Sequence, residues 1–224
     1  MVTDPFAACE DSVRRHDPDR FYAALFAPES ARRHLFALYA LYGELAHAAQ
    51  AAREPAILAI RLAWWRDAIA AARAGRPGDH HVSQALAVVL AEHTLPEEPF
   101  ARLIEARADE REGFADAAAA EAHAEATSGA LMRLAAAVLG GEANEAAREA
   151  GIAYWLAGRD EERLHGAAAL ARRHYQAARG LGIPRALMPA FLPAALVPLY
   201  LKRRDPPTWR KQVALLAAAL RGRI

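Results

Sequence analysis

Two short segments concentrate carboxylates at spacings that could hold a hard cation. They are Glu105–Asp116, which reads EARADEREGFAD, and Gly158–Gly166, which reads GRDEERLHG. Acidic side chains three to five residues apart on a helix project from one side, and Mg²⁺ prefers such oxygen ligands. In the first segment Arg107 and Arg111 alternate with the acids, which is typical of a salt-bridged, solvent-exposed helix face. We therefore expect no metal site there.

Other patterns that commonly carry chemistry are missing from the sequence. It contains no glycine-rich phosphate loop and no Cys/His spacing typical of a metal site. None of Ser30, Ser83 and Ser128 stands in a motif with a base and an orienting acid. Cys9 is the single cysteine and has no basic cluster beside it. No local motif therefore indicates a nucleophile or a cofactor.

Composition predicts a compact chain without a general affinity for polyanions. Hydrophobic residues make up 54% of the 224 residues, charged residues 25%, and the formal net charge is +1. These values exclude a disordered chain, and we expect no nucleic-acid partner. The single cysteine indicates a reducing compartment, and the first residues show no export signal. We expect a cytoplasmic protein.

Apolar residues repeat at helical spacing along nearly the whole chain. Proline or glycine marks many of the expected boundaries, and no alternating β-branched run predicts a strand. The expected fold is an all-α, single-domain bundle over residues 1–224, in which residues 1–16 form a loosely attached segment. Helices are expected at residues 6–15, 20–28, 30–53, 55–75, 83–93, 96–112, 119–139, 144–157, 161–181 and 209–221.

The helix expected at residues 30–53 has an unusual apolar stripe. Two tyrosines stand beside alanine on it, so broad aromatic walls border a gap. One interpretation is that the stripe lines a cavity, and the alternative is that these aromatic side chains pack as ordinary core residues. The residues of the stripe are Leu35, Leu38, Tyr39, Tyr42, Ala46 and Ala49.

The C-terminal part combines an apolar stretch with basic residues. Residues 186–201 are uncharged, but prolines interrupt them and they fall short of the roughly 20 residues that a membrane-spanning helix needs. Together with the basic residues this stretch suits contact with a partner or a membrane surface, and the alternative is a solvated helix end. The basic residues are Lys202, Arg203, Arg204, Arg210, Lys211, Arg221 and Arg223.

The order of several segments resembles the squalene and phytoene synthases, the head-to-head prenyl synthase family. The resemblance covers residues 17–224 and implies an all-α isoprenoid-synthase-like bundle, shortened relative to the family. The last two segments are similar to a bacterial branch that is itself similar to the assembly factor of mitochondrial respiratory complex I. The segments are DPDRFYAALFAPESARRHLFALYALYGELA, IRLAWWRDAI, ATSGALMRLAAAVLG, AGIAYWLAGRDEERLHG, LMPAFLPAALVPLYLKR and WRKQVALLAAALRGRI.

The resemblance implies a substrate pocket between two facing acidic motifs that hold Mg²⁺ on prenyl diphosphates. The metal ions neutralise the leaving diphosphate, and aromatic faces stabilise the carbocation in a dry pocket. Thr127 and Gly129 also fit a close approach of two helices. The residues that fall at pocket positions are Phe21, Tyr22, Tyr39, Tyr42, Ala46, Gln50, Thr127, Gly129, Tyr154 and Trp155.

At the first acidic motif this sequence departs from the family pattern. Ala46, His47 and Gln50 occupy it, and none of them carries a carboxylate. Glu44 is displaced and is expected to point away from the apolar stripe.

The second motif is incomplete as well. Trp155 replaces its glutamine, Gly158 its asparagine and Gly166 its last aspartate. Weak candidates for a catalytic role remain nearby, with Arg159 as the diphosphate partner; they are Arg159, Asp160, Glu161 and Glu162.

Removing one electrostatic stabiliser costs about 2.7–4 kcal/mol, or roughly 10²–10³ in rate. We therefore expect a catalytically inactive family member without metal or cofactor. It would act as a binding or assembly factor for a protein partner of a respiratory complex, cytoplasmic or peripheral on the inner face of the membrane. The alternatives are a prenyl transferase of isoprenoid biosynthesis with a degenerate Mg²⁺–diphosphate site, and a carrier of an apolar isoprenoid.

Overall fold

The computed structural model describes residues 4–108, 110, 113–159 and 164–224. These residues form helices and no strand, which confirms the all-α prediction. The α-helices are α1 (Pro5–His16), α2 (Pro18–Ala24), α3 (Glu29–Ala51), α4 (Pro55–Arg73), α5 (His81–Glu92), α6 (Glu98–Glu105), α7 (Ala117–Ala124), α8 (Ala130–Val138), α9 (Asn144–Ala157), α10 (Ala167–Gly180), α11 (Met188–Phe191), α12 (Val197–Tyr200) and α13 (Thr208–Arg221). A π-helical turn, η2 (Glu125–Gly129), joins α7 to α8, and the 3-10 turns η3 (Arg185–Leu187) and η4 (Leu192–Leu196) flank α11.

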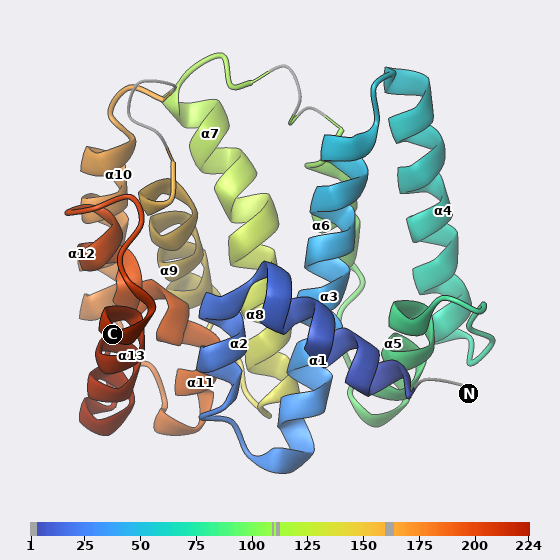
Figure 1. Cartoon of the computed structure of the whole chain (residues 1–224), viewed down its shortest axis with the longest axis horizontal. Helices are drawn as coiled ribbons and strands as arrows, with labels where there is room; N and C mark the ends of the chain where they lie inside the picture. The colour runs from blue at the N-terminus through green and yellow to red at the C-terminus, as the bar shows by residue number, and fades with distance from the viewer. Residues whose placement is uncertain (1–3, 109, 111–112, 160–163) are drawn as a thin grey trace.

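Helix α3 runs through the middle of the bundle, with α4 at one end and α10, α12 and α13 at the other (Figure 1). It packs against α1, α5 and α8. Leu35, Leu38, Leu41 and Leu45 recur every three or four residues along it and are completely buried. Each buried leucine contributes about 1.5–3 kcal/mol relative to an exposed one. The leucine positions of α3 thus hold the centre of the fold together.

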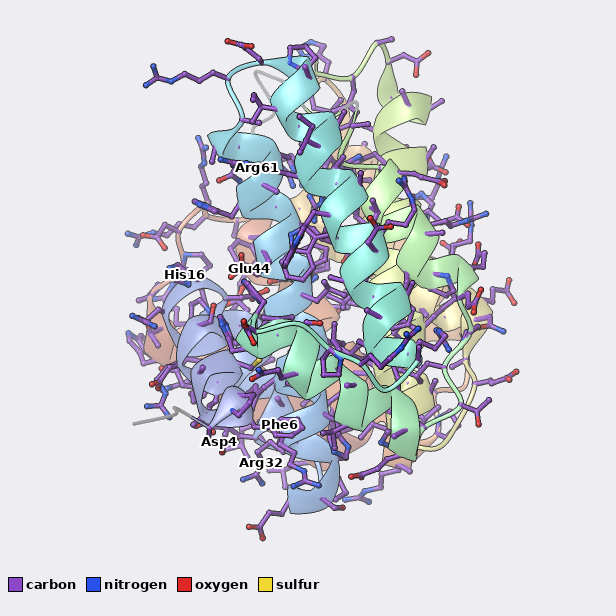
Figure 2. The ribbon with its side chains drawn as sticks, turned by 90° about the vertical axis from the view of Figure 1, so that its right-hand side faces the viewer. Asp4, Phe6, His16, Arg32, Glu44 and Arg61 are labelled. Carbon is purple, nitrogen blue, oxygen red and sulfur yellow. The ribbon has the colours of Figure 1, made fainter. Side chains whose placement is uncertain are left out.

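Helix α1 packs into the bundle, which corrects the expected loose attachment of residues 1–16 for their described part, residues 4–16. The side chain of Asp4 accepts the N–H of Phe6 and caps the helix. Cys9 and Val13 are buried where α1 packs against α3 and α5. Figure 2 shows Asp4 and Phe6 at the start of this helix. Burial of Cys9 and Val13, one turn apart, thus helps to hold residues 5–16 against the bundle.

Most of the proline-rich stretch before α13 packs inside the bundle. Its prolines occupy the first positions of short helical turns, where the missing N–H is not needed. Met188, Phe191 and Leu196 are buried. Exposed apolar side chains lie on α13 instead. No helix in the described part of the chain combines the length and apolarity needed to cross a bilayer.

Helix α9 crosses the π-helical turn η2 at two glycines. A Cβ atom added at Gly151 would lie 2.5 Å from the backbone N and Cα atoms of Gly129. Thr127, next to this crossing, is buried and donates its hydroxyl to the carbonyl of His123 at 2.7 Å. Only glycine at position 151 permits this close approach.

We expect Gly151→Ala to lower the free energy of unfolding by about 1–3 kcal/mol, because the new methyl group overlaps backbone atoms that cannot move independently. Gly43→Ala is the matched control, since a Cβ atom there meets nothing within 4 Å and lies within α3. That control should be stabilised by about 0.5–1 kcal/mol. Urea unfolding of both variants measures the difference, and equal stabilities would contradict the close crossing.

Candidate functional site

A cleft of about 710 Å³ opens between α1 and α3. Ala46, His47 and Gln50, the residues at the first acidic motif, line it together with Tyr39 and Tyr42. The stripe on α3 thus borders an open space, although Tyr39 is itself buried. This side of α3 keeps an open cleft where the resemblance implies the first metal motif.

Two carboxylates, Asp17 and Glu44, line this cleft. Asp17 is committed to Arg20, whose Nη1 lies 2.6 Å from its Oδ2 atom. Glu44 comes from α3 and faces His16 at the end of α1, as Figure 2 shows. Mg²⁺ bound to a diphosphate is usually held by one or two carboxylates in addition to the phosphates. With Asp17 paired to Arg20, Glu44 is the remaining carboxylate among the lining residues, so the cleft lacks the pair of acids one helical turn apart that the resemblance implies.

A second, smaller cavity of about 270 Å³ lies between α2, α3, α9 and α12. Tyr42 lines both cavities. Tyr154 and Trp155 of α9 contribute aromatic walls, and Arg159 stacks on Trp155 with its Cζ atom 3.8 Å from the ring centre. The remaining catalytic candidates, Asp160, Glu161 and Glu162, lie outside the described residues.

Arg20 lines the small cavity as a buried charge. Its Nη2 donates to Oγ of Ser128 at 3.2 Å, and its guanidinium lies over the rings of Tyr42 and Tyr154. Burial disfavours its charge, but the carboxylate of Asp17 outweighs burial and holds the pKa of Arg20 above its ordinary value. Arg20 therefore stays charged throughout the working pH range.

Arg107 is also buried, which corrects the expectation that it belongs to a solvent-exposed helix face. Its Nη1 lies 2.7 Å from Oε2 of Glu110, while its Nε and Nη2 atoms have no hydrogen-bond partner. The guanidinium stacks on Tyr42 with its Cζ atom 4.6 Å from the ring centre, the same distance as the Cζ atom of Arg20. Burial raises the pKa of Tyr42, but Arg107 and Arg20 together lower it below its ordinary value.

Two tyrosines that line the small cavity, Tyr154 and Tyr200, donate their hydroxyls to the carboxylate of Asp19. Its Oδ2 accepts the hydroxyls of Tyr154, at 3.0 Å, and of Tyr200, and its Oδ1 lies 3.1 Å from Nζ of Lys211. Lys211 also donates to the hydroxyl of Tyr200 at 2.8 Å. Asp19 thereby ties α2 to α9, α12 and α13. Burial and the nearby charge of Asp19 raise the pKa values of Tyr154 and Tyr200.

Four of the predicted pocket residues line neither cavity. Phe21 stacks on Phe36 with ring centres 5.5 Å apart, and Tyr22 packs at the edge of the same core cluster. Thr127 and Gly129 lie in the crossing of η2 with α9. Sequence reasoning does not identify Asp19 and Arg20 as site residues, because their only local sign is the DPDR run at residues 17–20. It places Arg107 on a solvated helix face.

Side chains able to hold a metal ion gather elsewhere. In the described part of the chain they are His34, Glu92 and His93, at the start of α3 and the end of α5. His34 contacts His93 through a ring–ring hydrogen bond of 3.0 Å, and Nε of Arg33 lies 3.2 Å from its other nitrogen. The cluster thus satisfies its own polar groups and lies apart from both cavities.

We expect Asp19→Asn to lower the free energy of unfolding by about 1–3 kcal/mol, because Lys211 loses its buried counter-charge and two tyrosines lose a charged acceptor. Asp79→Asn, a change on an exposed loop, should stay within about 0.5 kcal/mol of the wild type. Thermal or urea unfolding tests both. An Asp19 variant as stable as the Asp79 control would show that the contacts of Asp19 do not stabilise the fold.

His123 beside Trp155 makes stability depend on pH. Burial lowers its pKa from 6.5 to about 4. Since the unfolded chain then binds the proton more readily, stability is complete above pH 6.5 and declines as the pH falls towards 4. We expect His123→Phe to reduce the loss of stability between pH 7 and pH 5 by about 2 kcal/mol, and His165→Gln on the surface to leave it unchanged. The free energy of unfolding is measured at both pH values. An equal loss between pH 7 and pH 5 in the wild type and in both variants would contradict this.

Comparison with known proteins agrees with the all-α fold. A sequence model of the squalene/phytoene synthase family matches residues 13–158. The structure superposes on squalene synthase HpnC from Alicyclobacillus acidocaldarius with a TM-score of 0.71 and 19% identity, covering 97% of this chain and 94% of that chain. It superposes on a dehydrosqualene synthase in complex with ligand with a TM-score of 0.71 and 13% identity, covering 97% and 96% of the two chains. No curated protein sequence matches. The helical fold and the family match together place this chain in the squalene/phytoene synthase family.

Proposed function

We propose that the protein is a family member that binds and does not carry out Mg²⁺-dependent prenyl transfer. The observation that carries this proposal is the lining of the cleft at the first motif. Ala46, His47 and Gln50 face it, and of its two carboxylates Asp17 is neutralised by Arg20. The donor set does not fit the Mg²⁺ ions that would neutralise a leaving diphosphate.

The rate lost with each missing electrostatic stabiliser supports the same conclusion. Each missing stabiliser removes roughly 10²–10³ in rate, so the loss of several leaves little turnover. Arg159 lies at the rim of the small cavity as a cation, which complements a bound anion and repels a metal ion.

We expect no pyrophosphate release when the protein is incubated with farnesyl or geranylgeranyl diphosphate and Mg²⁺ at high protein concentration. Squalene synthase HpnC serves as the positive control, because it shares the fold. Mg²⁺-dependent release that disappears in Asp160→Ala would establish the transferase alternative and contradict the proposal.

An assembly factor for a respiratory complex is the form of binding function that the sequence resemblance favours. In that role the family bundle serves as a recognition surface. Loss of the protein should then lower the amount of assembled complex I while squalene and phytoene stay unchanged. A changed isoprenoid content with normal complex I would support a transferase. The carrier alternative is less well supported, since charged Arg15, Asp17 and Glu44 line the larger cleft.

The exposed face of α13 suits an anionic membrane surface. Trp209, Val213, Leu216 and Leu220 form one stripe along it and are between 48% and 70% exposed. Residues 206–224 contain basic and no acidic side chains, and Arg210 stacks on Trp209 at 5.2 Å. A basic amphipathic helix with a tryptophan binds best where apolar chains meet anionic headgroups. We therefore propose peripheral contact with anionic lipid through α13.

Sedimentation with vesicles tests this surface. The protein should bind phosphatidylglycerol-containing vesicles and not pure phosphatidylcholine, and the double change Trp209→Ser with Leu220→Ser should abolish binding. Ile60→Ser is the matched control, since Ile60 is 66% exposed on α4 at the other end of the bundle. Equal binding by the α13 variant, or self-association through α13 without lipid binding, would contradict the membrane proposal.

A further inference from the structure

Two histidines and a glutamate from different helices meet near the start of α3. His34 lies in the second turn of α3, Glu92 is the last residue of α5, and His93 follows it directly. Each of the three offers a ligand atom, and these atoms all lie within 4.8 Å of one another. His34 and His93 are 59 residues apart in the sequence, so the tertiary fold brings them together and no local spacing predicts the cluster.

The hydrogen bonds of the cluster assign a neutral ring to His34. An arginine side chain has no acceptor atom, so Nε of Arg33 donates to Nε2 of His34, 3.2 Å away. The ring proton of His34 is then on Nδ1, which donates to Nε2 of His93 at 3.0 Å. Nε2 of His93 accepts this proton through its lone pair. Neutral imidazole with an accepting nitrogen is the form of histidine that binds metal ions.

The two ring nitrogens that face each other have nearly the separation that a shared metal ion needs. Nδ1 of His34 and Nε2 of His93 lie 3.0 Å apart. Two imidazole nitrogens bound tetrahedrally to Zn²⁺ at about 2.0–2.1 Å lie about 3.3 Å from each other. A metal ion can therefore replace the proton between the rings after a small turn of the half-buried His93 ring. The displaced proton passes to Nε2 of His34, and the exposed side chain of Arg33 moves away from that atom into solvent.

Glu92 supplies the third ligand and a negative charge. Its Oε1 lies 3.4 Å from Nη2 of Arg33, and the two side chains are 47% and 52% exposed. Its Oε2 lies 3.5 Å from Nε2 of His34. An ion pair this exposed contributes little to stability, and its side chains are free to rearrange. A divalent cation held by two imidazoles can therefore replace Arg33 as the partner of this carboxylate.

The cluster is accessible from solvent on the side of His93. This residue lines a cleft of about 660 Å³ formed by α3, the end of α8, α11 and α13. His34, in contrast, is buried and its ring centre lies 5.8 Å from that of Phe6, the residue of α1 labelled in Figure 2. One ligand is thus held in place by packing, while an ion can enter from the cleft. Water or a bound molecule in the cleft can complete the coordination of the ion.

We infer that His34, Glu92 and His93 form a binding site for a divalent transition-metal ion of the zinc type, which links α3 to α5. Imidazole ligands suit Zn²⁺ and its neighbours in the transition series, whereas Mg²⁺ requires oxygen ligands. Zinc sites with three protein ligands keep a fourth position open for water or another molecule. The inference is independent of the proposed function, because the cluster lies apart from the cavities at the two acidic motifs.

Calorimetric titration of the full chain with Zn²⁺ tests the inference, after EDTA treatment and exchange into buffer without chelator. The wild type should bind one ion, and excess Mg²⁺ should not displace it. Only the folded chain brings the three ligands together, so bound Zn²⁺ stabilises the fold. At a Zn²⁺ concentration about 100 times the dissociation constant, the midpoint of thermal unfolding should rise by about 5–10 °C.

Three variants at exposed or half-buried positions separate a metal site from a merely structural cluster. His93→Gln and Glu92→Gln should each weaken Zn²⁺ binding at least about tenfold. Arg33→Gln should strengthen it about three- to tenfold, because a positive charge beside the ion is removed. His165→Gln and Glu145→Gln, changes at exposed positions outside the cluster, are the matched controls and should bind as the wild type does.

Three results would overturn the inference. They are the absence of binding at millimolar Zn²⁺, equal affinities in His93→Gln and His165→Gln, and displacement of the bound ion by Mg²⁺. Weaker binding by Arg33→Gln would also contradict it, because the loss of a neighbouring positive charge cannot weaken a cation site. Failure here leaves the proposed absence of prenyl transfer intact, since that proposal is tested by pyrophosphate release.

Discussion

The buried charge of Arg20 is the constraint around which the two cavities are organised. A guanidinium removed from water is tolerated only when it is paired and hydrogen-bonded, and Asp17 and Ser128 do this. The pairing takes Asp17 out of the cleft beside α3 as a metal ligand. The neighbouring Asp19 is likewise committed to Lys211 and two tyrosines. Asp17 and Asp19 therefore stabilise the fold.

The same contacts connect the site to the tightest packing in the bundle. Ser128, which accepts from Arg20, belongs to the π-helical turn that meets Gly151 of α9. Tyr154 and Trp155 follow Gly151 within one turn and form walls of the small cavity. π-Helical turns inside α-helices are frequent at functional sites. In this chain the turn fixes the distance between the arginine of α2 and the aromatic residues of α9.

Much of the fold follows from local pattern, whereas the charged part of the site does not. The three-to-four-residue spacing of leucines on α3 and the capping prolines predict the helices, because helical periodicity is a local property. The open space beside Ala46 could be predicted from two tyrosines flanking a small residue. Arg107 looked solvent-exposed because alternating charges are typical of a surface, yet only tertiary packing shows that Tyr42 covers it. The contact of Asp19 with Tyr200 and Lys211 joins segments far apart in sequence, and no spacing rule predicts it.

The central claim is the proposed one, that this family member binds its ligand without Mg²⁺-dependent prenyl transfer. The Mg²⁺ dependence of diphosphate affinity, measured by calorimetry with and without the metal, tests it most directly. The described lining of the small cavity includes Arg20 and Arg159 and no carboxylate, so we expect added Mg²⁺ to leave the affinity unchanged or to weaken it, because the ion competes with Arg159 for the same oxygens. An affinity that rises tenfold or more with Mg²⁺ would show that a metal-binding carboxylate set survives, and would contradict the account.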